Sequence, residues 1–430
     1  MKTALIAALI GAFAFDLYAG ISRKRLIIKL KDNSNFPELM YVTGKKHLFN
    51  SYYVVYSNKL KKLKAELKLN KNISAFENDF ITKQDILSPS ITDQLTYSQK
   101  KQRIFNDPLV YSKWSILNSE ANGISLFRTH KENITRATKK LVVAVLDTGI
   151  DFKHEDIPVW KNKEEIPRNG FDDDNNGYID DVYGINTTYR RRSITATNNV
   201  MDFHDHGTHL AGVIGAKFQN ELGVVGVATN VKIMGLKVIS KHHTLSDVDM
   251  IEAIIYAVDN GAKIINTTFL KDLDKSTNAL KDVIKYVSKK NDVLFITGAG
   301  NNSRNLKYFP AAPASYDIDN MLVVGSTDKY GGLSYFSNYG VKSVDIAAPG
   351  SSIYSTIRNN KYFYMSGTSI ASAVVSGVAA EVWSNYPHLS AQQVKEVLLS
   401  SVTPIDVLEG RILTEGRVDL YNAIKKAEKL

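Results

Sequence analysis

Apolar runs alternate with helical patterns through the chain from residue 141 onward. The helical patterns cover 247–260, 278–289, 369–384 and 391–401. The apolar runs have the nearly continuous character of strands buried on both faces of a parallel sheet: LVVAVLDTG, KIMGLKVIS, AKIINTTFL, DVLFITGAG, NMLVVGST and VDIAAPG. This alternation predicts an α/β fold with a doubly wound, mostly parallel sheet flanked by helices. In such sheets the chemistry lies beyond the carboxyl ends of the strands.

A smaller unit with a different pattern stands in front of this domain. RLIIKLKD, SYYVVYS and NISAFENDF are typical of strands, and KLKKLKAELK is typical of a helix with Leu60, Leu63 and Leu67 on one face. We therefore expect residues 20–103 to form a small α+β module and residues 104–430 to form the larger domain.

The segment TYSQKKQRIFNDP, which joins the two units, is polar and basic. Backbone of this kind is usually exposed and is a preferred site of proteolytic cleavage, with Lys100, Lys101 and Arg103 as the obvious targets. An ordinary interdomain linker is the alternative interpretation.

Residues 1–19 follow the pattern of a secretory signal peptide, with Lys2, an apolar run from Ala4 to Phe15, and the small residue Ala19. The alternative, a short membrane anchor, suffers because about 12 apolar residues fall short of the roughly 20 that span a bilayer. We expect cleavage near Ala19, a secreted or periplasmic protein, and no stable membrane span afterwards.

The positive charge of the chain is concentrated at its front. The formal net charge is +10, and residues 1–102 hold 17 Lys and Arg against 8 Asp and Glu, whereas the rest holds 37 against 36. An enzyme that acts on DNA or RNA would carry its basic surface on the catalytic body, so we expect no nucleic-acid partner. The absence of cysteine excludes disulfides and thiol nucleophiles.

The stretch FHDHGTHLAG places His204, His206 and His209 within six positions. Imidazole is the commonest transition-metal ligand and also the usual proton carrier near neutral pH. The cluster therefore fits a metal site or the base of a hydrolase, and polar loop residues without chemistry are a third interpretation.

Three further polar residues occupy places where catalytic groups are found. Asp147 ends the strand LVVAVL; an aspartic protease would need a second Asp-Thr/Ser-Gly motif, which the chain lacks. Ser369 enters a helix, where a serine serves as an N-terminal cap or as a nucleophile near free N–H groups. Asn301 follows a strand in a glycine-rich turn, where an amide can donate to an oxyanion.

Taken together, the blocks DTGID, HGTHLAG, GAGNN and GTSIAS, in this order and with long separations, resemble the subtilisin-like serine proteases, peptidase family S8. The resemblance covers about residues 104–425 and implies a serine endopeptidase that hydrolyses peptide bonds through an acyl-enzyme.

The resemblance also assigns roles to residues. It implies that His206 is the general base, that Asp147 orients its ring, and that Ser369 attacks the peptide carbonyl. Asn301 and the backbone N–H of Ser369 would hold the oxyanion. His204 and His209 then become supporting residues rather than ligands.

The walls of the primary specificity pocket depart from the family pattern on one side. The residues of the two walls are Thr268, Phe269 and Leu270, and Gly298, Ala299 and Gly300. The family usually has Ser-Leu-Gly in the first wall, so Leu270 replaces a glycine and is expected to narrow the pocket. The second wall keeps the small residues of the family.

Calcium is the cofactor that the resemblance implies. The family's strong site corresponds to side chains of Asp156 and Asn220 and backbone oxygens of Phe218, Leu222 and Val224; a plain turn is the alternative. Separately, DDDNNGYIDD has the alternating acidic pattern of hard-cation loops, at Asp172, Asp174, Asn176 and Asp180. It lacks the glutamate that closes an EF-hand loop, so a second calcium site and a solvated acidic hairpin both remain open.

The resemblance interprets the front module as a propeptide that assists folding and inhibits the enzyme, with the mature protein beginning close to Ile104. The expected partners are protein or peptide substrates and the protein's own propeptide. Two alternatives remain: a catalytically silent relative that acts as a binding protein, and a metallohydrolase built on the three histidines.

Overall fold

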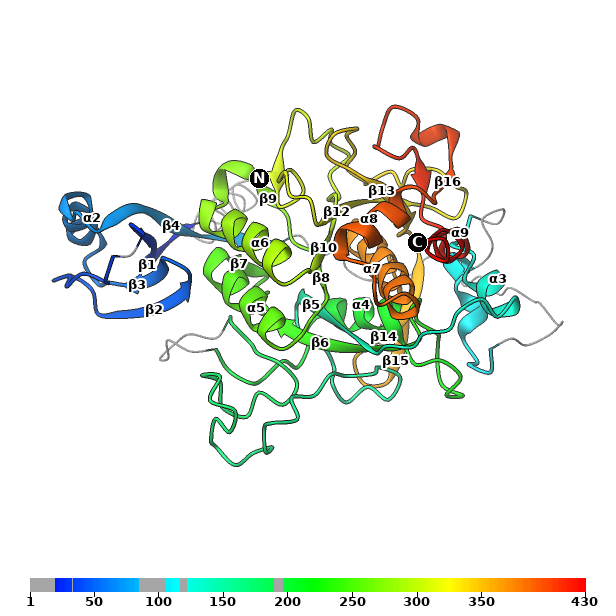
Figure 1. Cartoon of the computed structure of the whole chain (residues 1–430), viewed down its shortest axis with the longest axis horizontal. Helices are drawn as coiled ribbons and strands as arrows, with labels where there is room; N and C mark the ends of the chain where they lie inside the picture. The colour runs from blue at the N-terminus through cyan, green and yellow to red at the C-terminus, as the bar shows by residue number, and fades with distance from the viewer. Residues whose placement is uncertain (1–19, 33, 85–104, 117–121, 189–195) are drawn as a thin grey trace, which may run out of the picture.

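The computed structural model describes residues 20–32, 34–84, 105–116, 122–188 and 196–430. The expected signal peptide, the cleavage targets Lys100, Lys101 and Arg103, and the expected new terminus at Ile104 lie outside the described residues. Within the described residues the two expected units are present, the front module lying beside the larger domain (Figure 1).

An eight-stranded sheet forms the centre of the larger domain, in the order β16-β17-β13-β12-β10-β8-β5-β6. Neighbouring strands are parallel, except that β16 and β17 are antiparallel. The strands are β5 (Leu141–Asp147), β6 (Val231–Lys237), β8 (Ile264–Thr267), β10 (Leu294–Gly298), β12 (Met321–Thr327), β13 (Ile346–Pro349), β16 (Thr403–Pro404) and β17 (Gly416–Arg417). The expected doubly wound α/β fold is confirmed.

Helices cover both faces of this sheet and give it two separate apolar layers (Figure 1). One layer is closed by α5 (Asp247–Asp259) and α6 (Asn278–Lys290). The other is closed by α3 (Leu126–Lys131), α4 (His206–Gly215), α7 (Thr368–Asn385), α8 (Ala391–Leu399) and α9 (Leu420–Ala427). Both faces of the strands are therefore buried, which explains their continuous apolar sequence.

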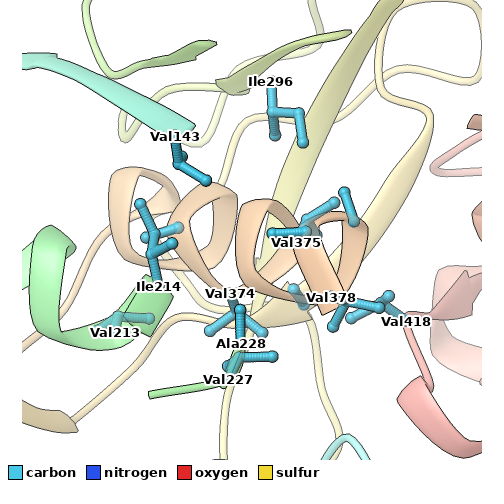
Figure 2. Close-up of a cluster of buried hydrophobic side chains, with 14 of the residues drawn as sticks. Val143, Val213, Ile214, Val227, Ala228, Ile296, Val374, Val375, Val378 and Val418 are labelled. Atoms are coloured by element: carbon cyan, nitrogen blue, oxygen red, sulfur yellow. The ribbon is translucent and has the colours of Figure 1, made fainter. Parts of the chain in front are cut away.

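Helix α7 runs through the core rather than over it. All residues from Thr368 to Ser384 are buried, and a helix that is apolar all round is stable only when it is surrounded. Figure 2 shows the side chains that enclose it: Val374, Val375 and Val378 of α7 lie among Val143, Val213, Ile214, Val227, Ala228, Ile296 and Val418. The first turn of α7, which carries Ser369, is consequently held in a fixed place.

The strand order makes β5 the point where the connections diverge. The chain leaves β5 for β6 on one side and then returns to β8 on the other side of β5. In open α/β sheets, ligands bind outside the carboxyl ends of the strands at such a point. Asp147, the last residue of β5, therefore lies where a site is expected.

The front module is a small α+β unit, as expected. Its strands are β1 (Gly20–Leu30), β2 (Gly44–Phe49), β3 (Tyr52–Tyr56) and β4 (Ile73–Lys83), and its helix is α2 (Leu60–Leu69). Leu63 and Leu67 are buried against the sheet, whereas Leu60 is half-buried. Strand β2 was not expected from the sequence, because GKKHLF begins with four polar or small residues before its two apolar ones.

The sheet of the module is completed by a strand of the larger domain. Its order is β2-β3-β1-β4-β7, and β7 (Thr244–Ser246) belongs to the larger domain. The pairing of β4 with β7 is antiparallel and joins Ile81 to Ser246 and Lys83 to Thr244. The two units therefore share backbone hydrogen bonds.

Two acidic side chains of β4 cap helices of the larger domain. Asp79 Oδ1 accepts a hydrogen bond from the backbone N–H of Val248 in the first turn of α5 (3.3 Å), and Glu77 Oε2 accepts one from Asn278 at the start of α6 (2.8 Å). Unpaired N–H groups and a partial positive charge make helix N-termini favourable places for carboxylates. Asp79 is also paired with Arg25, which reaches Ser246 of β7.

The remaining strands form two hairpin-like pairs, β9 (Lys271–Asp272) with β11 (Ala311–Ala312) and β14 (Ile353–Ile357) with β15 (Lys361–Met365). In the second pair the turn residues Asn359 and Asn360 both have positive φ, as tight hairpin turns require. Among the described residues no helix combines the length and the apolar character needed to cross a membrane.

Candidate active site

Asp147, His206 and Ser369 meet beyond the carboxyl end of β5. The Nε2 atom of His206 lies 2.9 Å from Ser369 Oγ, and its Nδ1 atom lies 2.8 and 2.9 Å from the two carboxylate oxygens of Asp147. The three residues come from the end of a strand and the first turns of two buried helices, 59 and 163 positions apart along the chain. The sequence prediction that these three side chains converge is confirmed by the geometry.

Close packing between the turn after β5 and the start of α4 brings His206 to Asp147. A Cβ atom at Gly207 would collide with the carbonyl oxygen of Gly149 and would come within 3.2 Å of the Asp147 side chain. Gly149 itself has φ of +100°, a conformation that other residues rarely adopt. The glycines of the DTG and HGT blocks are therefore required by backbone approach.

The carboxylate of Asp147 has no contact with water and is held by several donors. The backbone N–H of Thr148 donates to it at 2.7 Å, the Thr148 hydroxyl donates at 3.1 Å, and the hydroxyl of Thr268 donates to the other oxygen. Burial by itself raises the pKa of Asp147, but the attraction of His206 and the hydrogen bonds from His206 and Thr268 bring the net pKa below its ordinary value.

The opposite balance holds for His206. Burial by itself lowers its pKa, but the neighbouring carboxylate of Asp147 outweighs burial and raises the net pKa above the ordinary value of 6.5. Asp147 thus does two things: it stabilises the protonated ring, and it fixes the ring so that Nε2 faces Ser369.

Asn301 lies beside the residue that precedes the serine. Its Oδ1 atom accepts hydrogen bonds from the backbone N–H and the hydroxyl of Thr368, at 2.9 and 3.0 Å, and the Thr368 hydroxyl accepts from the N–H of Gly300 at 2.9 Å. Because both of these groups donate to Oδ1, these hydrogen bonds do not use the Nδ2 group of Asn301, which can donate to another acceptor.

The other two histidines of the cluster do not form a metal site with His206. His209 is fully buried, its Nε2 atom lies 2.9 Å and 3.1 Å from the carbonyl oxygens of Ile353 and Phe363, and burial lowers its pKa to about 3. His204 stacks edge to face on His243, with ring centroids 4.0 Å apart. His209 is a neutral core residue that ties α4 to the β14–β15 pair.

A second buried carboxylate, Asp202, was missed by the sequence interpretation. It accepts hydrogen bonds from the N–H and hydroxyl of Thr208 in the first turn of α4 (3.0 and 2.6 Å) and from the Thr148 hydroxyl (2.8 Å). It therefore links the start of α4 to the residue that follows Asp147. Its position four residues before His206 was the available signal, but only the fold shows that it faces the site.

Two of the residues predicted to line the specificity pocket lie against each other. Leu270 lies against Gly300, where an added Cβ would come within 2.6 Å of Leu270 Cδ1, so these two residues face each other. A cavity of about 790 Å³ opens beside Leu270 and extends to Asn302, Tyr308 and Phe309.

The other four wall residues lie elsewhere. Phe269 is fully buried in the apolar layer under α5 and α6, and Ala299 is buried in the same layer. Gly298 lies against the backbone of Thr368, and Thr268 donates to Asp147. The side chain of Phe269 is thus directed into the core, and the assignment of these residues to the pocket walls stays a prediction.

The residues of the first expected calcium site share one loop. Positive φ angles occur at Gln219, Glu221 and Gly223, which alternate with the predicted ligands Phe218, Asn220, Leu222 and Val224. Asp156 is buried beside this loop and accepts from the Asn220 amide at 3.0 Å and from the Val224 N–H at 3.1 Å.

Asp107 is a further carboxylate at this loop, and the sequence interpretation missed it. It is 1% exposed and accepts from the backbone N–H groups of Gln219 and Asn220, at 3.1 and 3.2 Å. Burial, aided by the charge of Asp107, raises the pKa of Asp156 to about 6. Two buried carboxylates at a loop rich in oxygen donors have the chemistry of a hard-cation site.

The acidic loop forms a cluster whose membership differs from the prediction. Among the described residues the one group of acidic or histidine side chains within ligand distance is Glu165, Asp172 and Asp174. Glu165 is 5% exposed, and its Oε2 atom is buried without a hydrogen-bond partner. Asp180 is not part of the group: its oxygens accept from the N–H groups of Asn169 and Gly170.

Asn176, the remaining predicted ligand, holds the acidic loop together from within. Its Nδ2 group donates to Asp174 at 2.9 Å and to Asp181 at 3.0 Å. Because Glu165 lies seven positions before Asp172, outside the alternating motif, the sequence pattern gave no reason to include it.

A serine, a histidine and a buried carboxylate in this order of contact are the arrangement of a serine hydrolase. The family model described as "Subtilase family" matches residues 138–419, more than half of the chain. The chain belongs to the subtilase family, and this membership supports a serine protease function.

Named relatives agree with this assignment. The chain is 32% identical over 349 residues to subtilisin-like protease 1 of Plasmodium falciparum, covering 76% of this chain and 48% of that protein. It is 33% identical over 293 residues to a thermophilic serine proteinase of Bacillus sp. (strain AK1), covering 68% of this chain and 63% of the relative. The chain thus spans about half the length of the first of these relatives.

A solved structure confirms the fold over nearly the whole chain. The epidermin leader peptide processing serine protease of Staphylococcus aureus matches with a TM-score of 0.66 at 21% identity, covering 94% of this chain and 98% of that structure. A protease of Pseudoalteromonas arctica matches with a TM-score of 0.59 at 24% identity, covering 76% and 100%.

The raised pKa of His206 predicts how activity depends on pH. The ring must be neutral to accept a proton from Ser369, so kcat/KM should fall as the pH decreases through a pKa above 6.5. In Asp147→Asn the attraction is lost, so the acid limb should move to lower pH while kcat drops by several orders of magnitude. Profiles of kcat/KM from pH 5 to 9 measure both effects. A wild-type acid limb centred below 6.5 would contradict the assignment.

Proposed function

We propose that the protein is a secreted serine endopeptidase that is made with an inhibitory propeptide and stabilised by calcium. The observation that carries the proposal is the contact of 2.9 Å between His206 Nε2 and Ser369 Oγ, with the other ring nitrogen bonded to the buried Asp147. Geometry of this kind places a base on a hydroxyl that is otherwise a weak nucleophile.

In the proposed reaction His206 takes the proton of Ser369 as its oxygen attacks the peptide carbonyl. The imidazolium that forms is stabilised by Asp147, which stays ionised, and it then protonates the leaving amine. Water attacks the acyl-enzyme in the second half of the reaction, with His206 again acting as the base.

The oxyanion of each tetrahedral intermediate would be held by Asn301 Nδ2 and the backbone N–H of Ser369. Two features support this role: the Asn301 side chain is fixed through its oxygen by Thr368, and Ser369 lies in the first turn of α7, where N–H groups are free. Donors that are fixed before the reaction need no reorganisation in the transition state.

The docked position of the front module supports its role as a propeptide. Strand β4 pairs with β7 and ends at the cavity beside Leu270. There the backbone N–H of Gln84 donates to the His243 carbonyl, and the Gln84 side chain accepts from the N–H of Leu270, at 3.3 Å. The end of the front module thus lies beside Leu270, the proposed specificity residue. Cleavage near Arg103 and export directed by residues 1–19 complete this proposal.

Calcium would be held by the Asp156 and Asn220 side chains and the loop carbonyls, with Asp107 as an additional carboxylate. The acidic loop with Glu165, Asp172 and Asp174 is the second proposed calcium site, supported by the unpartnered Oε2 atom of Glu165. The ion would neutralise buried carboxylates and hold the loops in place.

The proposed nucleophile gives the first test of this function. Wild-type protein should hydrolyse casein and should be labelled at Ser369 by a fluorophosphonate, whereas Ser369→Ala should lose both properties, with a drop in kcat of about a million-fold. Measuring casein hydrolysis after confirmed removal of residues 20–103 separates an inactive zymogen from a silent relative. Equal inactivity of both processed proteins would favour the binding protein, and zinc-dependent activity without labelling would favour the metallohydrolase.

The contact of Leu270 with Gly300 predicts the primary specificity. Leu270→Gly should raise kcat/KM for substrates with a large aromatic residue before the scissile bond, relative to alanine, by about 10- to 200-fold, the range expected for a pocket contact. Leu270→Met keeps the volume and should leave the ratio nearly unchanged. Paired peptide substrates measure the ratio, and an unchanged ratio in Leu270→Gly would place the pocket elsewhere.

Removal of calcium should lower thermal stability. At calcium 100 times above its Kd, binding contributes about 2.7 kcal/mol, so chelation should lower Tm by several degrees. The measurement is best made on Ser369→Ala, which cannot digest itself. Adding Asp156→Asn should abolish most of the calcium-dependent part, whereas Asp180→Asn, which the structure leaves outside both sites, should retain it. A Tm that is unchanged by chelator in every variant would rule out the calcium proposal.

A further inference from the structure

A large cavity lies where the front module meets α6, and none of its lining residues belongs to the triad or to the specificity pocket. Its volume is about 970 Å³, at the upper end of the range for small-molecule sites. The end of β1 and the turn between β2 and β3 form one side, and the solvent face of α6 forms the other. Figure 1 shows these elements side by side.

Five lysines line the cavity from both sides: Lys29, Lys31, Lys285, Lys289 and Lys290. Lys29 lies near the end of β1 and Lys31 directly follows its last residue, and both line the cavity. Lys285 and Lys289 are four positions apart on a helix, so they lie on one face. Lysines from both units thus line a common space.

The cavity contains little negative charge, and one of its carboxylates is already bonded to other protein groups. The lining contains two carboxylates, Asp32 and Asp282. Asp282 accepts a hydrogen bond of 2.6 Å from the Tyr52 hydroxyl and forms an ion pair of 3.4 Å with Lys29. Lys31, Lys285 and Lys289 form no ion pair with any residue that the structure describes. The cavity therefore carries an excess of positive charge that the protein itself does not neutralise.

Aromatic side chains from both units pack together beside the cavity and connect its two sides. Phe49 and Tyr52 of the module stack with ring centroids 4.8 Å apart, and Tyr286 of α6 lies 6.2 Å from Phe49. Phe49 and Tyr52 are buried. Lys290 Nζ donates a hydrogen bond of 2.7 Å to the Tyr286 hydroxyl, which holds that ammonium group beside the ring. The lysine side chains thus lie beside a packed aromatic cluster that joins the two units.

We propose that this cavity binds a soluble oligophosphate and that binding fastens the front module to the larger domain. Lysine acts as a point charge for phosphate, and several closely spaced ammonium groups favour a ligand with several phosphates over orthophosphate. Because each side supplies part of the site, the ligand binds the docked form in preference to the separated units. By linkage, ligand at ten times its Kd would tighten docking about eleven-fold.

The first experiment measures binding of sodium tripolyphosphate to full-length Ser369→Ala protein by titration calorimetry. We expect one site per chain, with orthophosphate at matched ionic strength binding at least tenfold more weakly. Three variants each change the charge by two units: Lys31→Glu on the module side, Lys285→Gln with Lys289→Gln on α6, and Lys61→Gln with Lys68→Gln on the exposed surface of α2 as the control. The first two should each weaken binding at least tenfold, and the control should bind as before.

The outcomes separate the proposal from its alternatives. Equal weakening in the control would show a general charge effect, and weakening by the α6 changes alone would show a site that does not join the two units; either result overturns the proposal. Circular dichroism confirms that each variant is folded. Because Ser369→Ala is catalytically inert by design, the binding result stands or falls independently of the proposed protease activity, which casein hydrolysis by wild-type protein tests separately.

Discussion

The burial of one negative charge organises the centre of this molecule. Asp147 ends a strand that is covered on both sides, and its carboxylate must be compensated there by other groups because water does not reach it. The compensation comes from the turn after β5, from the start of α4 through His206, and from Thr268 after β8. If any one of these donors is removed, the buried charge of Asp147 is compensated by fewer hydrogen bonds. The contacts that permit Asp147 to be buried therefore also fix the position of His206.

The three residues of the proposed triad could be predicted from the sequence because they lie at the ends of strongly patterned elements. Asp147 follows an apolar strand, and His206 and Ser369 begin helices that are apolar all round, so the chain order and the blocks sufficed. Asp202, Asp107 and Glu165 could not be predicted in this way. Each is a carboxylate whose role depends on which distant loop or helix it faces, and single-chain patterns do not contain that information.

The architecture was predictable to a similar degree. Continuous apolar sequence predicts the central strands of a parallel sheet, whereas β2 begins with four polar or small residues and β7 has only three residues, so neither shows such a pattern. The pairing of β4 with β7 in particular joins residues more than 160 positions apart. The hairpin of β14 and β15 is an intermediate case, since its Asn359-Asn360 pair is a turn signal that is present in the sequence.

The caps that β4 provides to α5 and α6 bear on how long the larger domain survives alone. In the proposed maturation the module is removed, and the N–H groups of Val248 and Asn278 would then lose the carboxylates of Asp79 and Glu77 and would have to bond to water instead, at a cost of about 1 kcal/mol for each cap. An enzyme matured in this way would be less stable than the chain that folded with these partners. Its working lifetime would then depend on how slowly it unfolds, and unfolded molecules would not readily refold.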